Sequence, residues 1–312
     1  MNLKNKRIFA LGETLLDILF ENNQPIKAVP GGSMLNAAVS LGRMGTAVEL
    51  LSEFGSDPAG AIISGFLQLN SVGTTYSHKY RQHKTSIAMA FLDTARNATY
   101  SFYHDIPDRI PGYRNPGFTM DDILLFGSFY SINPSRRDII LALLHSARSS
   151  DCIRLFDPNI RKNQTGFSAK NLESIRENMS LSSITKGSDE DFAFLFETDD
   201  PESIYEKVKE YCPLLIITSG SKAVKLFTPS LKASYSVPEI VPVSTIGAGD
   251  NFNAGILFGI ISLGLNSADL PGLEAEKWNK IIGCGISFAK ETCLSMENYI
   301  PRGLKNLDPE SN

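Results

Sequence analysis

Short apolar runs alternate with segments of helical spacing along most of the chain. Five runs predict strands that end in glycine or in polar residues: RIFALG, AVELLSEFG, DILLFGS, CIRLFDPN and LLIITSG. Between them, four segments have the spacing of amphipathic helices: residues 34–44, 59–69, 135–149 and 172–181. This alternation is typical of a parallel sheet covered on both faces. It predicts an α/β fold in which ligands bind at the carboxyl ends of the strands.

Two segments depart from this alternation. Residues 19–30 are polar and extended, and residues 74–103 are rich in β-branched and aromatic residues. Residues 86–91 alternate with period two, and residues 96–98 carry a turn signal. These features predict a small antiparallel sheet that is separate from the main one.

The composition is that of an ordinary globular protein. Of its 312 residues, 42% are apolar and 21% are charged, and the net charge is −4. The length fits one large α/β domain or a domain with an insertion. No long run of like charges occurs, so we expect no nucleic-acid partner.

The chain shows no sign of a membrane or secreted protein. Glu13 and Asp17 interrupt the apolar stretch near the N-terminus, which argues against a signal peptide. No stretch approaches the roughly 20 apolar residues of a membrane span, so we expect no membrane partner. The four cysteines lie in apolar segments without CxxC spacing. They predict reduced core thiols in a cytoplasmic protein.

The stretch STIGAGDNFNAGILFGI at residues 244–260 places Gly247, Ala248, Gly249 and Asp250 directly before an apolar helix. A helix N-terminus offers unpaired N–H groups and partial positive charge, and glycines let an anion come close. The stretch is therefore a candidate anion hole, with Asp250 as the base for an attacking hydroxyl. The alternative, which a lone GxGD motif favours, is a tight turn with Asp250 as helix cap.

A second stretch, PGGSMLNAAVSLGRMG at residues 30–45, pairs Gly31 and Gly32 with Asn36 in the first turns of a helix. Paired glycines beside an amide suit close packing of a polyol against the backbone. A loop followed by an alanine-rich packing helix is the alternative.

Together, the two stretches resemble the two signatures of the ribokinase-type (PfkB) carbohydrate kinases, nearest to the fructokinases. Residues 30–45 resemble the GG…N.A…LG pattern, and residues 244–260 resemble DTxGAGD. Further motifs follow in the family's order along the whole chain: GETLLD with Asp17, DPNIR at 157–161, KGSDED at 186–191 and TSGSKA at 218–223.

The resemblance implies a ribokinase-like three-layer α/β/α sandwich with a mostly parallel central sheet. Residues 1–312 would form one kinase domain, with a small β-sheet lid from segments of about 18–30 and 74–106. It also implies phosphoryl transfer from ATP to a primary hydroxyl of a sugar, with Mg²⁺ on the phosphates. We expect a homodimer through the lid, since its strands would otherwise leave an open edge.

The resemblance also assigns roles to residues. Asp250 matches the general base, and the backbone of Gly247, Ala248 and Gly249 matches the anion hole. Asp191 matches a residue that holds Mg²⁺ through water. The predicted sugar-binding residues are Asp17, Gly31, Gly32, Asn36, Tyr103, Asn159 and Arg161. The predicted nucleotide-binding residues are Lys186, Ser188, Thr218, Ser219, Gly220, Gly247 and Gly249.

Some of these residues have structural alternatives. Arg161 would hold a phosphate or a negative substrate group, or form a surface salt bridge. Tyr103 and His104 would close over the substrate, or pack within the lid. For the nucleotide-side loops, ordinary loop chemistry is the alternative.

The chain departs from the family at four positions. Ser244 stands where aspartate is usual, near a site that binds a monovalent cation in some relatives, so this requirement stays open. Ser188 and Asp191 replace asparagine and glutamate, and Ala223 replaces a frequent glycine. Asp191 keeps the carboxylate on a side chain one methylene shorter.

The GGSMLN stretch lacks the lysine that typically follows the glycines in ribokinases. Together with DPNIR, it favours fructose, phosphorylated at its 6-hydroxyl. The runner-up is 2-keto-3-deoxygluconate, whose carboxylate would meet Arg161. A catalytically weakened sugar-binding or regulatory protein is the alternative of another class, although such a protein has no use for a base at Asp250.

Overall fold

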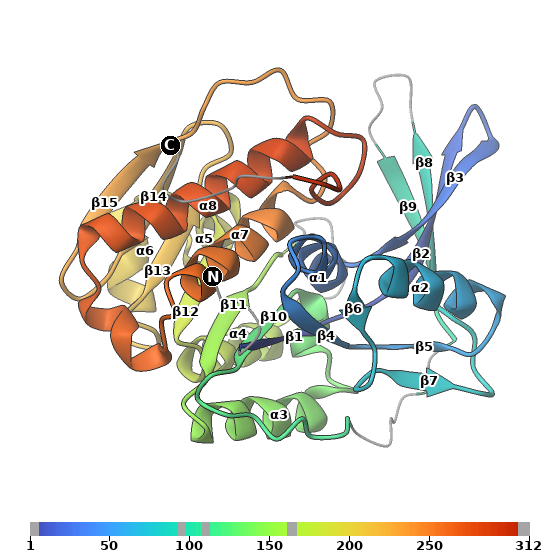
Figure 1. The fold of residues 1–312 in the computed structure, drawn as a ribbon, viewed down its shortest axis with the longest axis horizontal. Coiled ribbons are helices and arrows are strands. Elements are labelled where there is room, and N and C mark those ends of the chain that lie inside the picture. Colours follow the sequence, from blue (N-terminus) through green and yellow to red (C-terminus); the bar gives the residue numbers. More distant parts are fainter. Residues whose placement is uncertain (1–5, 93–97, 106, 108–112, 161–166, 305–312) are drawn as a thin grey trace.

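The fold is seen in a computed structural model that describes residues 6–92, 98–105, 107, 113–160 and 167–304. In these residues a nine-stranded sheet runs through the centre of the molecule (Figure 1). Its order is β15 (Lys232–Ser236), β14 (Ala223–Phe227), β13 (Leu215–Thr218), β12 (Ile184–Ser188), β11 (Ile153–Asp157), β10 (Ile123–Gly127), β1 (Arg7–Leu11), β4 (Ala47–Leu51) and β6 (Val72–Gly73). The strands from β13 to β6 pair in parallel, and β14 pairs antiparallel with both of its neighbours.

Helices cover both faces of this sheet. One face carries α1 (Ser33–Arg43), α2 (Pro58–Leu69), α7 (Ala248–Ser262) and α8 (Ala275–Cys293). The other carries α3 (Arg137–Ser149), α4 (Ala169–Leu181), α5 (Asp189–Phe196) and α6 (Pro201–Val208). Two short 3₁₀ helices are η1 (Phe129–Ile132) and η2 (Ser267–Gly272). Successive strand residues alternate between the two cores, as Ile8 and Phe9 do, so the predicted three-layer α/β/α sandwich is confirmed.

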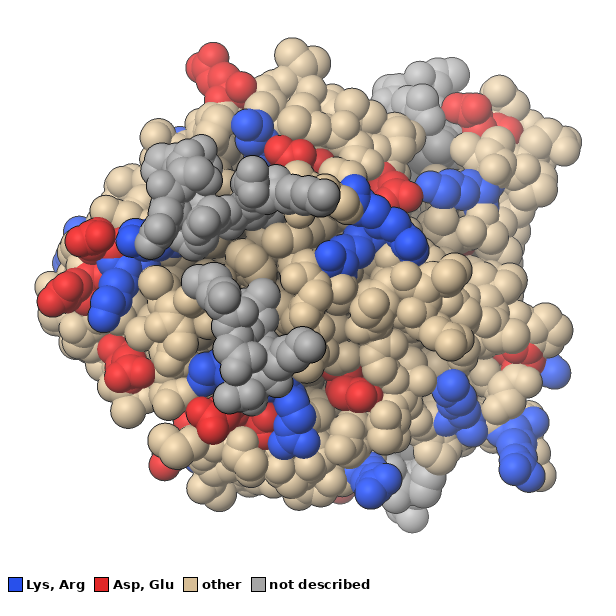
Figure 2. All heavy atoms as spheres, in the orientation of Figure 1, with Lys and Arg blue, Asp and Glu red and all other residues tan. Residues whose placement is uncertain are grey.

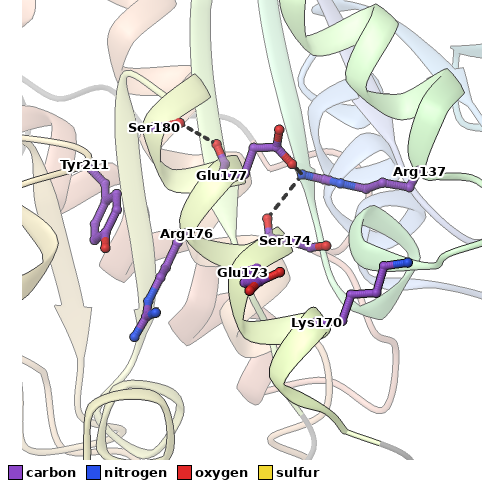
Figure 3. A pocket seen from close by; sticks show the side chains of 8 residues that line it. All are labelled: Arg137, Lys170, Glu173, Ser174, Arg176, Glu177, Ser180 and Tyr211. Carbon is purple, nitrogen blue, oxygen red and sulfur yellow. Dashed lines mark hydrogen bonds and ion pairs between the residues drawn. The ribbon is translucent and has the colours of Figure 1, made fainter.

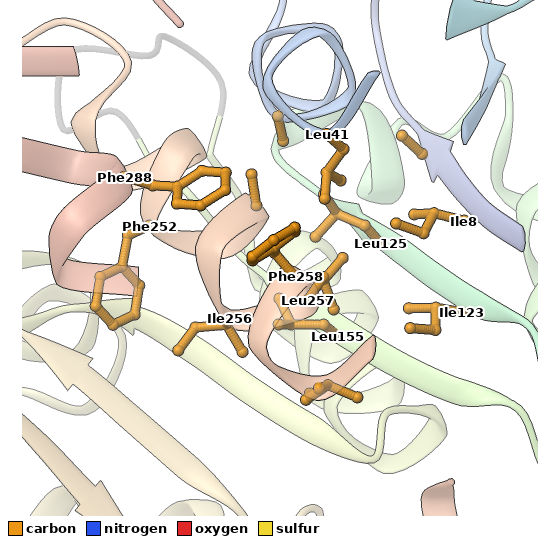
Figure 4. Packing of buried hydrophobic residues seen from close by; sticks show 14 of the residues in the cluster. Ile8, Leu41, Ile123, Leu125, Leu155, Phe252, Ile256, Leu257, Phe258 and Phe288 are labelled. Atoms are coloured by element: carbon orange, nitrogen blue, oxygen red, sulfur yellow. The ribbon is translucent and has the colours of Figure 1, made fainter. Parts of the chain in front are cut away.

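The helix that follows the GAGD motif is buried on every side. Residues 250–261 of α7 are all buried, because its sequence is apolar on every side beyond the polar residues Asp250, Asn251 and Asn253 near its start. Figure 4 shows its side chains packed among those of the sheet, α1 and α8: Phe252, Ile256, Leu257 and Phe258 lie near Leu41, Leu125, Leu155 and Phe288. This packing fixes the first turn of α7 against the rest of the fold.

A second sheet, called the small sheet below, lies apart from the main one (Figure 1). Its order is β3 (Gln24–Gly31), β2 (Leu15–Glu21), β8 (Ile87–Leu92) and β9 (Ala98–Tyr103). It was expected to be antiparallel. Its two hairpins, β2/β3 and β8/β9, are antiparallel, but β2 and β8 join them in parallel. The turn predicted at 96–98 falls mostly outside the described residues.

One predicted strand is divided in two. Ser52 separates β4 from β5 (Glu53–Gly55), which pairs with β7 (His78–Tyr80) instead of continuing in the main sheet. Glu53 is buried and accepts hydrogen bonds from Arg136 and Tyr80, which explains why a charged residue is tolerated there.

The surface carries charges of both signs. Figure 2 shows acidic and basic side chains interspersed over the visible face. Within the part of the chain that the structure describes, no helix has both the length and the apolar character needed to cross a bilayer. All four cysteines are free thiols; Cys293 is half-buried, and the other three are buried as predicted.

Candidate active site

The predicted site residues lie in loops at the carboxyl edge of the parallel strands. Asn159 follows β11, Ser188 ends β12, and Thr218 ends β13, where it pairs in register with Ser188. The first turns of α1 and α7 reach the same place, because side chains of α1 and of Asn159 contact Asp250 in α7. The structure therefore brings together residues from five segments that are distant in the sequence.

Three side chains donate hydrogen bonds around Asp250. Asn36 Nδ2 lies 2.9 Å from Asp250 Oδ2, and Ser33 Oγ donates to Oδ1. Asn159 Nδ2 lies 2.9 Å from Ser33 Oγ and 3.4 Å from Asp250 Oδ1. Gly247, not Asp250, is the N-cap residue of α7, and α7 has no side-chain cap. The alternative in which Asp250 caps its own helix is therefore not what the structure shows.

Burial raises the pKa of Asp250 from its usual value to about 6. The hydrogen bonds from Ser33 and Asn36 lower the pKa, and nearby Asp157 raises it further. The side chain is only 9% exposed, which accounts for the dominance of desolvation. A carboxylate with this pKa is mostly ionised at neutral pH and still binds a proton readily, as a general base must.

The turn before Asp250 has a fixed conformation that leaves backbone N–H groups unpaired in the described structure. Gly247 has φ +80°, and a Cβ there would lie 2.5 Å from the carbonyl oxygen of Asn298, so only glycine fits. Asn251 Nδ2 fastens the turn by donating to the carbonyls of Gly247 and Asn298. Among the described residues, the backbone N–H groups of Gly249 and Asp250 have no hydrogen-bond partner. They give α7 an unpaired, positively polarised N-terminus.

A buried ion pair lies next to this turn. Lys186 Nζ is 2.9 Å from Asp157 Oδ2, and Asn253 Nδ2 donates to the same oxygen at 2.7 Å. Asp157 Oδ1 accepts from the N–H of Asn159, which turns that residue toward Asp250. All three members of the Lys186–Asp157–Asn253 network are less than 4% exposed.

Three residues of this site were not singled out from the sequence: Ser33, Asp157 and Asn253. Two of them stood inside recognised motifs. Ser33 directly follows the paired glycines, and Asp157 opens DPNIR. Asn253 had no sequence signal, because it lies one turn into a helix that reads as apolar packing.

Asp191 holds the start of α5. Its Oδ2 accepts from the N–H and Oγ of Ser188, and its Oδ1 accepts from the N–H of Ile160 at 2.9 Å. Burial raises the pKa of Asp191 above its usual value. No group of three potential metal ligands occurs within the described ranges. Both carboxylate oxygens accept hydrogen bonds from the protein, and the role of Asp191 through water stays a prediction.

The small sheet presents Asp17 beside the paired glycines. A Cβ on Gly31 would lie 2.0 Å from Asp17 Oδ2, so the bare glycine makes room for the carboxylate. Gly32 has φ +131° and is the N-cap of α1, and Asn36 lies in the helix four positions further on. The end of β3 and the start of α1 thus form one continuous stretch beside Asp17, which is called the path below. It holds four of the predicted sugar-binding residues: Asp17, Gly31, Gly32 and Asn36.

Tyr103 does not lie on the same side of the small sheet as Asp17. Asp17 pairs with Ala88, and Ala88 pairs with Phe102, so these three lie on one face of the small sheet. Tyr103 lies on the opposite face and is 58% exposed. Phe102 and Tyr100 share the face of Asp17 instead. His104 continues from this strand, with its Nδ1 3.1 Å from Ser86 Oγ.

The remaining residues noted in the sequence lie in turns or outside the described residues. Ser219 and Gly220 form the turn between β13 and β14, where Gly220 has φ +54°. Ser244 forms a local turn in which its Oγ accepts from the N–H of Ile246. Arg161 lies outside the described residues.

A hollow of about 520 Å³ on the outer side of α4 contains none of the predicted site residues. Figure 3 shows its lining, in which Arg137 pairs with Glu177 at 2.6 Å. Arg176, another of its charged side chains, has its Nε buried without a hydrogen-bond partner in the described structure.

The chain belongs to the pfkB family of carbohydrate kinases, whose model matches residues 7–277. The protein is thus a sugar kinase by family. Among curated relatives, the fructokinase of Salmonella typhimurium is 27% identical over 283 residues, which cover 86% of this chain and 89% of the relative. A putative sugar kinase of Pyrococcus horikoshii is 28% identical over 280 residues, with 84% and 85% covered.

Solved structures share the fold. The fructokinase of Xylella fastidiosa with bound ATP has a TM-score of 0.83 at 21% identity, with 95% of each chain covered. The fructokinase of Vibrio cholerae O395, in a form with fructose, ADP and calcium ion, has a TM-score of 0.80 at 20% identity, with 94% of each chain covered.

Proposed function

We propose that this protein is an ATP-dependent fructokinase that forms fructose 6-phosphate, with Asp250 as general base and the backbone of Gly247–Gly249 as anion hole. One observation carries the proposal: a buried carboxylate, held by Ser33 and Asn36, stands beside unpaired N–H groups at the start of α7. The names of the curated relatives support fructose as the acceptor.

In the proposed reaction the 6-hydroxyl oxygen of the sugar forms a bond to the γ-phosphorus of ATP. The bond from that phosphorus to the β,γ-bridging oxygen breaks, and its electron pair leaves with ADP. Asp250 accepts the hydroxyl proton, and the N–H groups of Gly249 and Asp250 stabilise charge on the phosphoryl oxygens.

Mg²⁺ would supply further positive charge on the phosphates of ATP. No group of three His, Cys, Asp or Glu side chains that could hold the ion occurs among the described residues. We therefore expect it to arrive with the nucleotide, as Mg²⁺ commonly does in phosphoryl-transfer enzymes. Asp191 would act only through a water molecule.

We assign the sugar to the path from Asp17 to Asn36. The carboxylate of Asp17 would accept bonds from two sugar hydroxyls, and Gly31 and Gly32 would let the ring approach the backbone. The small sheet would act as the lid of the single domain, with Phe102 rather than Tyr103 toward the sugar. The sugar-acid alternative depends on Arg161, which lies outside the described residues.

A coupled ADP-release assay with ATP and Mg²⁺ tests this function. The panel comprises fructose, ribose and 2-keto-3-deoxygluconate. We expect the highest kcat/KM with fructose. A higher value with the sugar acid would replace fructose by the runner-up. No turnover with any sugar, together with sugar binding by calorimetry, would identify a binding or regulatory protein.

We also propose a cytoplasmic homodimer that pairs through the small sheet. Its outer strand β9 is an edge in the described residues, and its side chains Phe102 and Tyr103 are 50% and 58% exposed. An exposed aromatic edge strand invites pairing with a second copy. Light scattering should give twice the mass of one chain, and the mass of a single chain would contradict the dimer. The free cysteines support the cytoplasmic location.

A further inference from the structure

Lys186 is a charged side chain in an almost fully enclosed position. It lies on β12, its residue is 3% exposed, and its ammonium lies 2.9 Å from Asp157 Oδ2. An ammonium group carries three protons, and Asp157 is its one hydrogen-bond partner within the described part of the chain. Two donor positions therefore remain for another acceptor.

The ammonium also lies against the anion hole. Its Nζ is 3.3 Å from the point that a Cβ of Gly249 would occupy. The N–H of Gly249 and that of Asp250 are unpaired in the described structure. A full positive charge and the positive end of a 15-residue helix thus meet at one place, with little water to screen them.

The partners of Lys186 fix its position. Asp157 receives hydrogen bonds from Lys186, Asn253 and the N–H of Asn159, so its carboxylate cannot turn away. The last of these bonds links the ion pair to Asn159, which contacts Ser33 and Asp250. The charge on Lys186 is therefore set in a defined relation to the proposed base.

We infer that Lys186 is a catalytic residue that donates to the transferring phosphoryl group, and that Asp157 and Asn253 are the residues that position it. This inference rests on the sugar kinase activity proposed above. While the γ-phosphorus passes from the bridging oxygen of ADP to the sugar oxygen, Lys186 and the two backbone N–H groups surround its non-bridging oxygens. The lysine keeps its proton, and Asp250 alone accepts one.

A double variant separates this role from a purely structural one. Lys186→Met leaves Asp157 buried without a counter-ion, so this single variant is expected to be unstable. Adding Asp157→Asn removes both charges. The Oδ1 of Asn253 is buried without a partner in the described structure, so its amide can turn and accept from the new amide. The double variant should therefore melt near the wild-type temperature.

The readouts are turnover and anion binding. In the double variant we expect kcat to fall by about 10²–10³-fold, the usual effect of losing one oxyanion donor, with KM for the sugar unchanged. Inorganic phosphate should raise the melting temperature of the wild type but not that of the double variant. Lys209→Met, which removes an exposed lysine, is the matched control and should behave like the wild type.

The outcomes distinguish the two proposals. If the wild type turns over a sugar, kcat decides: a stable double variant with wild-type kcat overturns the role of Lys186 and leaves the kinase intact. If the wild type turns over none, the fructokinase proposal fails, and phosphate protection decides instead. Protection that is present in the wild type and absent in the double variant supports anion binding by Lys186; equal or absent protection overturns it.

Discussion

Asp250→Asn is expected to lower kcat by about 10²–10⁴-fold, the range that a positioned general base contributes. The amide keeps the shape of the carboxylate and cannot accept the proton of the sugar hydroxyl. KM for the sugar should change little, because Asp17 and Asn36 remain. Initial rates in the ADP-release assay, with calorimetry of sugar binding, measure both quantities.

The change should not unfold the protein. Asn36 Oδ1 is buried without a partner in the described structure, so the amide of Asn36 can turn and accept from the substituted side chain. Asp138→Asn is the matched control, since Asp138 is also acidic and in the first turn of a helix but is exposed. If Asp250→Asn retains more than a tenth of wild-type kcat, Asp250 is not the base.

The raised pKa of Asp250 also predicts how the activity and the stability of the wild type depend on pH. The base works only when ionised, so wild-type kcat/KM should rise as the pH passes through about 6 and then level off. For stability the sign is opposite. Because the folded-state pKa lies above the usual value, the folded protein binds this proton more tightly than the unfolded chain does. The contribution is present below pH 4 and is lost as the pH rises through about 6.

Asp250→Asn removes this dependence. The shift from 3.8 to about 6 corresponds to about 3 kcal/mol at 1.36 kcal/mol per pKa unit, so the variant should be the more stable protein at pH 7.5. The difference in melting temperature between variant and wild type should grow from pH 4 to pH 7. A constant difference would show that the pKa of Asp250 is not raised.

Asp17→Asn is expected to raise KM for the sugar by about 10²–10⁴-fold, with a smaller effect on kcat. Each hydroxyl bond to a charged acceptor contributes about 1.5–3 kcal/mol, and the carboxylate of Asp17 would accept two. The amide retains one acceptor oxygen, so the rise in KM is expected at the lower end of this range. Steady-state kinetics over a wide range of fructose concentration give the two constants separately.

Glu21→Gln provides the control for that result. Glu21 is a carboxylate on the same strand and the same face, four residues further from the glycines. Its substitution should leave KM unchanged. An equal rise of KM in both variants would indicate a general effect of charge on the small sheet, and no rise in Asp17→Asn would remove Asp17 from the sugar site.

Much of the fold was predictable from local patterns. The strand at Arg7–Leu11 appears with the expected bounds, and the predicted helix 59–69 differs from α2 by one residue. These elements could be predicted because their apolar residues are regularly spaced and turn residues lie at their ends. Helix α4 begins at Ala169, earlier than expected, because Ser168 caps it with Asn171 in a polar first turn.

Other elements escaped prediction for physical reasons. The strand β12 reads ITKGS, and its lysine and glycine do not suggest a buried strand. Lys186 is buried there because Asp157 on the neighbouring strand supplies the counter-charge, and that pairing spans 29 residues. Such dependence of Lys186 on a distant partner leaves no local signal. Helix α8 was also not predicted, although its buried residues Trp278, Ile281 and Phe288 have helical spacing.

The candidate site follows the same rule. The motifs located Asp250, Asn36 and Asn159, but not the contact of Ser33 with Asp250, which joins residues 217 positions apart. The choice between Tyr103 and Phe102 depends on the register of β8 with β9. A shift of one residue exchanges the two faces, and composition does not fix it.

The joint between β3 and α1 limits how this enzyme can be rebuilt. Strand β3 ends at Gly31 and α1 begins at Ser33, with Gly32 as the single residue between them. The sheet that carries Asp17 therefore has no linker before the helix turn that holds Asp250. A small sheet grafted from a relative to alter sugar preference would need to bring its own first turn of α1. A crossover at residue 32 would otherwise change the position of Asp17 and that of the turn that contacts Asp250 at the same time.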